Sequence, residues 1–192
     1  MKVWAYLNSN GVLCCALTPS AVPQGVNTTE LDINSLDDVI YDGTQIRVKT
    51  QAELLQEAQQ KALQQLSQST MSYIYQYYPD WKQRSDISDL TNGEAYLTYA
   101  GLNPTQVRQT ITQQILSGAS YTQALSTLNQ TFNSNTNPTI GYWLEQLLNV
   151  AYRQDFVFKV KQQYYSISQQ ISSATALPLP SYTISVPPPN IP

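Results

Sequence analysis

The sequence contains no histidine, and its two cysteines are the adjacent residues Cys14 and Cys15. Without histidine, the chain lacks the most common general base and metal ligand, so Ser-His-Asp and Cys-His catalytic systems are excluded. Neighbouring side chains on a strand point to opposite faces, so these two cysteines cannot easily form a disulfide. We expect two reduced strand residues, one of them in the core, and neither a metal site nor a cofactor.

Charged residues are also scarce, at 12% of the chain, about half the usual fraction. The net charge is -3, and the few basic residues are scattered. Nucleic-acid binding is not expected, because it needs a concentrated basic face. No apolar run reaches the length of about 18 residues typical of a membrane span, so no membrane insertion is expected. The first residues lack the apolar run of a secretion signal, so we expect synthesis without export.

The first fifty residues carry the signals of β-structure. Two apolar runs flank Asn10-Gly11, and two more flank Asp42-Gly43. Both dipeptides tolerate the positive φ angles that tight hairpins need. We therefore expect a small antiparallel β-meander of about four strands in this region.

Three carboxylates in this module could suggest a calcium loop: Asp37, Asp38 and Asp42. A calcium loop of the EF-hand type needs oxygen ligands at positions 1, 3 and 5, glycine at 6 and glutamate at 12. Counted from Asp38, positions 3 and 12 are Ile40 and Lys49, so the spacing fails. Asp42 is better explained as a turn residue, and Asp37 and Asp38 as charges that keep an edge strand soluble.

A long helix is predicted to start after Thr50. Thr50 and Glu53 have the spacing of a capping box, and apolar residues then recur at three- and four-residue intervals. The opposite face is rich in glutamine. That face is either solvated or a network of side-chain amides between protomers.

The segment after this helix is rich in aromatic residues. Five of these residues are candidates for an interface: Tyr73, Tyr75, Tyr77, Tyr78 and Trp81. Aromatic side chains with polar tips favour half-hydrated interfaces. They could equally form the core and rim of the helical domain.

A second acidic cluster follows, at Asp80, Asp86 and Asp89. Paired carboxylates beside aromatic rings could cleave glycosidic bonds. However, a short helix would explain Asp86 and Asp89 as ordinary first-turn residues. This helix is expected to end at a turn formed by Asn92-Gly93. Since no phosphate-binding loop is present either, we expect no enzymatic activity.

Two Asn-Pro pairs, Asn103-Pro104 and Asn137-Pro138, each predict a helix start with an asparagine cap. The expected helices cover about 104–117, 120–132 and 138–173. In the last helix, apolar or aromatic residues recur every seven positions, at Trp143, Val150, Val157, Tyr164 and Ile171. This heptad row resembles a coiled-coil seam, although the companion row is interrupted at Gln146, Arg153 and Ala174. Packing within one bundle and oligomerisation explain it equally well.

Residues 177–192, called the arm below, have the sequence LPLPSYTISVPPPNIP, in which six of the sixteen residues are proline. Proline at this density prevents a helix and favours an extended chain, in which SYTISV could form one edge strand. The arm is either disordered or laid along a neighbouring surface. We expect docking through its apolar residues, including Leu179, Tyr182, Ile184 and Val186.

The first third of the chain resembles a known group of proteins. It combines the segments YLNSNG, AVPQGV and ELDINSLDDV with the stretch YDGTQIRVKTQAELLQEAQQKALQQL. Residues 1 to about 68 thereby resemble the N-terminal module of small bacteriophage tail proteins of the tail-fibre, fibre-attachment and tail-assembly type. In that group, a hairpin of the pattern DG-x-x-(I/V/L)-x-x-K leads into a helix rich in Gln, Glu and Lys. The matching positions are Asp42, Gly43, Ile46 and Lys49. The resemblance implies a virion or assembly role without enzymatic activity.

We therefore expect an α+β protein, mostly α, with a β-meander module (1–50), a helical domain (51–176) and the extended arm (177–192). Its expected function is that of a structural component of a phage tail or neck, located in the virion after synthesis in the host cytoplasm. It would act by oligomerisation and by docking of the arm. The expected partners are further copies of the chain, with trimers common among fibres, and other virion proteins. The alternatives are a tail-assembly chaperone absent from the mature virion, and a carbohydrate-binding module that uses Trp81.

Overall fold

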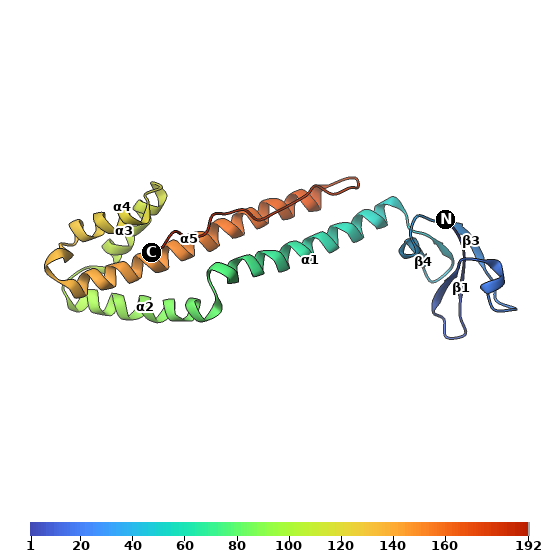
Figure 1. Cartoon of the computed structure of the whole chain (residues 1–192), viewed down its shortest axis with the longest axis horizontal. Coiled ribbons are helices and arrows are strands. Elements are labelled where there is room, and N and C mark those ends of the chain that lie inside the picture. The colour runs from blue at the N-terminus through green and yellow to red at the C-terminus, as the bar shows by residue number, and fades with distance from the viewer. Residues whose placement is uncertain (192) are drawn as a thin grey trace. The chain divides into compact units, whose positions relative to one another are not determined.

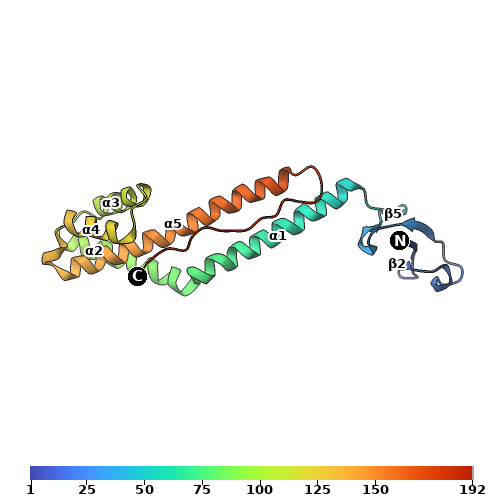
Figure 2. The same ribbon diagram turned by 45° about the horizontal axis from the view of Figure 1, so that its top comes forward.

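The computed structural model describes residues 1–191 (Figures 1 and 2). The fold is α+β and mostly α, as predicted, with a small antiparallel N-terminal sheet followed by helices. The chain forms two compact units, which we describe separately. The first contains Met1–Ala62 and Ala174–Leu179, and the second contains Leu63–Ser173 and the described residues from Pro180 onward. The predicted boundary at residue 50 coincides with the start of a helix. The boundary between the two units falls later, after Ala62, inside that helix.

A three-stranded antiparallel sheet begins the first unit. It contains β1 (Lys2–Leu7), β2 (Leu13–Ala16) and β3 (Thr29–Asp32) in the order β2-β1-β3. The predicted Asn10-Gly11 hairpin joins β1 to β2, and Gly11 adopts a φ of 73°. β3 follows a proline-rich loop with the short 3-10 helix η1 (Pro19–Ala21) and pairs with the other edge of β1. This order differs from a simple meander, in which each strand pairs with the next along the chain.

A second, two-stranded sheet completes the β-structure of this unit. It consists of β4 (Val39–Tyr41) and β5 (Ile46–Val48), and Gly43 in the connecting turn has a φ of 95°. The expected single sheet of about four strands is therefore five strands in two sheets. Val39 packs with Val3, Ala5 and Ile33 in one small core, which explains why two short sheets are stable together.

Asp37 and Asp38 lie in the 3-10 helix η2 (Leu36–Asp38) and not on an edge strand. The Asp38 carboxylate accepts a hydrogen bond from the Ser35 backbone N–H at 3.0 Å. The Ser35 hydroxyl in turn caps the start of η2 by accepting from the Asp37 N–H. The prediction for these two residues is therefore wrong, because a local capping box holds them in a turn just before β4.

The first helix, α1 (Gln51–Tyr77), starts where the sequence predicts. The Glu53 carboxylate accepts from the Thr50 N–H at 2.7 Å, and the Thr50 hydroxyl accepts from the Glu53 N–H at 3.3 Å. The predicted capping box is therefore present. α1 continues through the tyrosine-rich segment and ends before Pro79, whose ring cannot continue a helix that precedes it.

The second helix, α2 (Asp80–Tyr99), corrects the sequence prediction of a short helix and a turn at Asn92-Gly93. Gly93 is buried in the middle of α2. A Cβ atom placed there would lie 3.1 Å from Cε3 of Trp143 and 3.3 Å from Cδ2 of Leu147. Both residues belong to the last helix, α5 (Pro138–Ser173), so this glycine serves close packing between helices and not a turn.

The remaining helices follow their predicted boundaries closely. α3 (Pro104–Leu116) and α4 (Tyr121–Thr131) are followed by the 3-10 helix η3 (Ser134–Thr136) and by α5. Asn103 caps α3, and the Asn137 side chain accepts from the Thr139 N–H at the start of α5. None of the helices within residues 1–191 is long and apolar enough to cross a membrane.

The main core of the second unit lies where α2, α3 and α4 meet the first half of α5 (Figure 1). Its fully buried members include Leu97, Leu128, Leu144 and Leu148. The arm forms no strand over its described residues, so the predicted edge strand is absent. Both views show the arm, in dark red, returning alongside α5.

Gly93→Ala should destabilise the helical unit. Alanine favours a helix over glycine by about 1 kcal/mol, but forcing a methyl group against the packed Trp143 and Leu147 costs roughly 1–3 kcal/mol. We expect a lower thermal midpoint by circular dichroism. Asn92→Ala, at the exposed neighbouring position, is the control and should leave the midpoint unchanged or slightly raised. A Gly93→Ala protein as stable as the Asn92→Ala protein would contradict the packing role.

Candidate functional site: the arm and the surface that holds it

From Pro180 onward, the arm lies against two helical segments of the second unit, namely the second half of α1 and the second half of α5. The Tyr73 hydroxyl of α1 donates a hydrogen bond to the Val186 carbonyl at 2.6 Å. Tyr182 of the arm donates to the Gln65 side chain of α1 at 3.4 Å. We call the residues that hold the arm, namely Gln65, Tyr73, Phe156 and Gln163, the arm site.

Gln163 of α5 makes the most specific contact in the arm site. Its carbonyl oxygen accepts from the Ser185 backbone N–H at 2.9 Å, and its amide nitrogen donates to the Thr183 carbonyl at 3.4 Å. The same nitrogen contacts the Ser185 hydroxyl at 3.2 Å. One side-chain amide thus satisfies a donor and an acceptor of an extended backbone, as a neighbouring β-strand would.

Apolar contacts complete the arm site. Ile184, between the two backbone groups bound by Gln163, is 9% exposed. The Phe156 ring of α5 packs on Tyr73 and Tyr77, with centroid separations of 6.0 and 5.9 Å. A pocket of about 220 Å³ is lined by Tyr152, Phe156 and Lys159 and by the arm segment 186–190. The proline run therefore continues along α5 beyond the hydrogen-bonded part.

A buried ion pair lies one helical turn from this aromatic group. The Arg153 guanidinium of α5 holds both carboxylate oxygens of Asp86 in α2, with Nε–Oδ2 and Nη2–Oδ1 distances of 2.7 and 2.9 Å. The Asp86 side chain is 2% exposed, and the Arg153 side chain is 9% exposed. Lys82 approaches the same carboxylate at 3.2 Å. A bidentate, fully partnered pair of this kind fixes geometry as well as charge.

Tyr78 joins this ion pair to the corner between α1 and α2. Its hydroxyl donates to Asp86 Oδ2 at 2.8 Å, and the Arg153 guanidinium lies over its ring at 5.9 Å. Burial, together with the hydrogen bond to Asp86, raises the pKa of Tyr78. For Asp86, burial favours the neutral acid, but the bonds from Arg153, Tyr78 and Lys82 outweigh it and lower the pKa of this carboxyl.

This cluster positions the arm site. Tyr78 follows Tyr77 directly in the chain, and Arg153 precedes Phe156 by three positions, so that both lie on one side of α5. Fixing Tyr78 and Arg153 to Asp86 therefore fixes the aromatic group of Tyr73, Tyr77 and Phe156. The arm packs on a surface that the buried ion pair has already arranged.

Several predicted interface residues are buried inside the chain itself: Tyr78, Val150, Ile171 and Ile184. Trp143, Val157, Tyr164, Leu179, Tyr182 and Val186 are partly buried, as is Tyr73. The heptad row of α5 therefore packs largely within the chain, which favours the bundle interpretation for these positions. Trp81 is 70% exposed, and Tyr75 and Tyr77 are exposed as well.

The acidic cluster at the start of α2 does not form a pair of free carboxylates. Asp86 is bound by Arg153, Asp80 pairs with Arg84 at 2.7 Å, and Asp89 lies 3.8 Å from Lys82. The prediction that Asp86 is a first-turn residue of a short helix is wrong, because it lies within α2 and is buried. Sequence reasoning missed the pair. The available signal was Arg153, a charged residue interrupting an apolar row.

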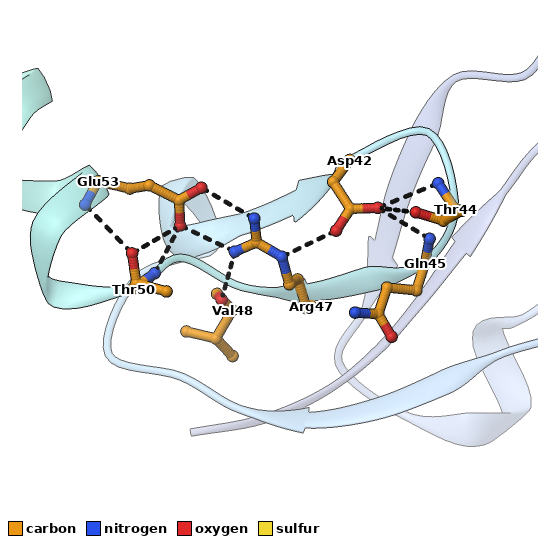
Figure 3. Close-up of polar contacts among 7 residues, drawn as sticks. All are labelled: Asp42, Thr44, Gln45, Arg47, Val48, Thr50 and Glu53. Atoms are coloured by element: carbon orange, nitrogen blue, oxygen red, sulfur yellow. Dashed lines mark hydrogen bonds and ion pairs between the residues drawn. The ribbon is translucent and has the colours of Figure 1, made fainter.

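The turn that suggested calcium binding has a different structure, shown in Figure 3. Asp42 accepts from the N–H groups of Thr44 and Gln45, both at 3.0 Å, and from the Thr44 hydroxyl. Arg47 then bridges Asp42, at 2.9 Å, to Glu53 in the first turn of α1, at 2.8 Å. Its guanidinium thus ties the β4–β5 turn to the capping box of the helix.

These contacts hold both carboxyls in the charged form. The hydrogen bond from Arg47 and those from Thr50 lower the pKa of Glu53 to about 2. The backbone N–H of Gln45 and the groups of Thr44 and Arg47 lower the pKa of Asp42 further. Within residues 1–191, no cluster of three or more acidic or cysteine side chains could hold a metal ion.

No protein-family model, no curated protein and no solved structure matches this chain. The features of this chain that bear on its function are therefore the arm site, the exposed aromatic residues and the resemblance in the first third of the sequence.

The Arg47 bridge predicts acid sensitivity of the first unit. Because the pKa of Glu53 is lower in the folded state than its unfolded value of about 4.3, its contribution to stability is complete above that value. It is lost as the pH falls through about 2. The protection factors of the β4 and β5 amides, which compare the measured hydrogen exchange with the intrinsic rate at the same pH, should therefore fall between these limits. Glu53→Gln should flatten this pH dependence, whereas Asp37→Asn, at an exposed carboxylate, should preserve it. An unchanged profile in Glu53→Gln would contradict the bridge.

Removing one partner of the buried ion pair should strongly destabilise the second unit. Arg153→Met or Asp86→Leu leaves a buried charge without its main partner, a change that costs about 3–5 kcal/mol. The double variant Asp86→Leu/Arg153→Met should lose less stability than the sum of the single changes. Urea unfolding followed by circular dichroism measures the three values. Strict additivity would show that the two side chains do not act as a pair.

Proposed function

We propose that this chain is a structural component of a phage virion, in the tail or neck, that acts through binding surfaces and not through catalysis. The proposal is supported by the resemblance of residues 1 to about 68 to the N-terminal module of small phage tail proteins. The Arg47 bridge holds the hairpin and the start of the helix in a fixed relative orientation. A rigid joint of this kind suits a component that positions its neighbours in an assembly.

The arm site is the observation that carries the proposal. Tyr73 and Gln163 bind the backbone of an extended segment, and Ile184 fills an apolar position between the two backbone contacts of Gln163. Surfaces that take up an extended segment in this way are a common device for connecting subunits. We propose that docking of the arm contributes to the contacts of this chain with its neighbours in the particle.

Exposed aromatic residues supply a second type of contact surface. Trp81 and Tyr99 are 70% and 88% exposed, and Tyr142 is 51% exposed. Tyrosine and tryptophan are enriched at protein interfaces because one end of the side chain is apolar and the other is polar. We propose a homo-oligomer, with other virion proteins as further partners.

The test is to look for the chain in purified particles. Particles from an induced culture of the source strain are separated by density-gradient centrifugation, and peptides in the particle and soluble fractions are quantified by mass spectrometry. We expect the chain to co-purify with the particles at a fixed ratio to other virion proteins. If it occurs in the soluble fraction alone, the structural role is wrong, and a tail-assembly chaperone becomes the better explanation.

A further inference from the structure

We propose that the arm site is a receptor for extended peptides whose occupant in the assembled protein is the arm of a second copy of this chain. The inference deepens the proposed function, since it names the partner and the residues for the oligomerisation suggested there. In the described chain the site holds the arm of the same copy, which shows what chemistry it accepts.

The hydrogen bonds of the site are directed mainly at backbone. Gln163 binds the Thr183 carbonyl and the Ser185 N–H, and Tyr73 binds the Val186 carbonyl. None of these three contacts depends on the arm belonging to the same chain. An identical segment from another copy can make each of them with the same geometry.

Side-chain contacts make the site selective for the arm's own pattern. Ile184 is buried, and Tyr182 reaches Gln65 through its hydroxyl. The run Pro187–Pro189 then lines the pocket with Tyr152 and Phe156. A fitting peptide therefore has a tyrosine, an isoleucine two positions later and a proline run after that, all in extended form. Prolines lower the conformational entropy lost on docking, because the free segment is already extended.

The connection between α5 and the arm favours exchange between copies. α5 ends at Ser173, and the chain must reverse its direction within residues 174–179 for the arm to return along the same helix. Pro178 and Pro180 restrict the backbone of this short connection and of the residues before them. A short connection that must turn sharply is the usual place at which an element is exchanged, since crossing to a neighbour removes the turn and keeps every docking contact.

Both helices of the arm site also leave large apolar side chains exposed on their outer faces. Met71 and Tyr75 of α1 are 48% and 44% exposed, and Phe158 and Tyr165 of α5 are 58% and 63% exposed. Met71 and Tyr75 lie two positions from Tyr73, and Phe158 and Tyr165 lie two positions from Phe156 and Gln163, a rotation of about 200° around each helix. A neighbouring copy whose arm crosses over brings protein surface close enough to cover them.

The first experiment distinguishes exchange from self-docking in the full-length chain. Chains labelled with ¹⁴N and with ¹⁵N are mixed, unfolded and refolded together, with a photo-crosslinking residue in place of the exposed Thr183. Cross-linked peptides that join the arm to α5 are then analysed by mass spectrometry. Peptides that pair the two isotopes support exchange. Cross-links confined to one isotope overturn it, because each arm then occupies the site of its own chain.

The second experiment tests the named residues by complementation between full-length chains. One variant, Tyr73→Phe/Gln163→Ala, has a weakened site and an intact arm, and the other, Ile184→Asp, has an intact site and an arm that cannot be buried. We expect each variant alone to remain monomeric by light scattering, whereas an equimolar mixture forms a one-to-one complex. Helix content by circular dichroism confirms that both variants fold.

Matched controls are available beside each altered residue. Gln162→Ala and Ser181→Asp change exposed neighbours of Gln163 and Ile184 and should leave the assembly of the wild-type chain unchanged. Restoring Gln163 alone in the first variant should strengthen its own assembly at least about tenfold, because this side chain makes three polar contacts with the arm. A mixture that stays monomeric while both variants are folded overturns the inference. That result leaves the proposed virion role standing, since the presence of the chain in particles is measured independently.

Discussion

The buried pair of Asp86 and Arg153 is the constraint on which the second unit depends. It connects α2 to the middle of α5, and through the Tyr78 hydroxyl it also holds the corner at which α1 turns into α2. Desolvating two charges is unfavourable, and replacing such a pair by apolar side chains often costs no stability. Its value here is geometric, because a bidentate contact allows one relative position of the two helices where apolar packing would allow several.

The arm site follows from this constraint. Phe156 is one turn from Arg153, and Tyr77 is adjacent to Tyr78, so the ring contacts around Tyr73 form on residues that are already held in place. The arm then adds a layer that has no secondary structure of its own. Side chains of Tyr73 and Gln163 bind three of its backbone groups, which an extended segment lying on helices cannot pair with a neighbouring strand.

Local chemistry explains which parts of the structure the sequence could predict. The two hairpins, the Thr50–Glu53 capping box and both Asn-Pro helix starts depend on residues within a few positions of one another, and all appear where expected. The error at Asp37 and Asp38 is local, because the Ser35 capping box holds them in a turn, but two other errors have tertiary causes. Gly93 looked like a turn residue because its real partners, Trp143 and Leu147, are distant in sequence. Asp86 is predicted to be a first-turn residue of a short helix for the same reason, since its partner Arg153 is 67 positions away in the sequence. The role of Gln163 carried no sequence signal, since the chain is rich in exposed glutamine.

The hydrogen bonds that hold the arm through Tyr73 and Gln163 come from a phenol and a carboxamide, both neutral groups. At physiological salt, ions in solution screen exposed charges that are more than about 8 Å apart and weaken exposed ion pairs, but they have little effect on hydrogen bonds between neutral groups. An attachment built from such groups stays the same in dilute and in concentrated salt. In the assembly proposed above, the contact between the arm and its site would therefore persist over a wide range of salt concentrations.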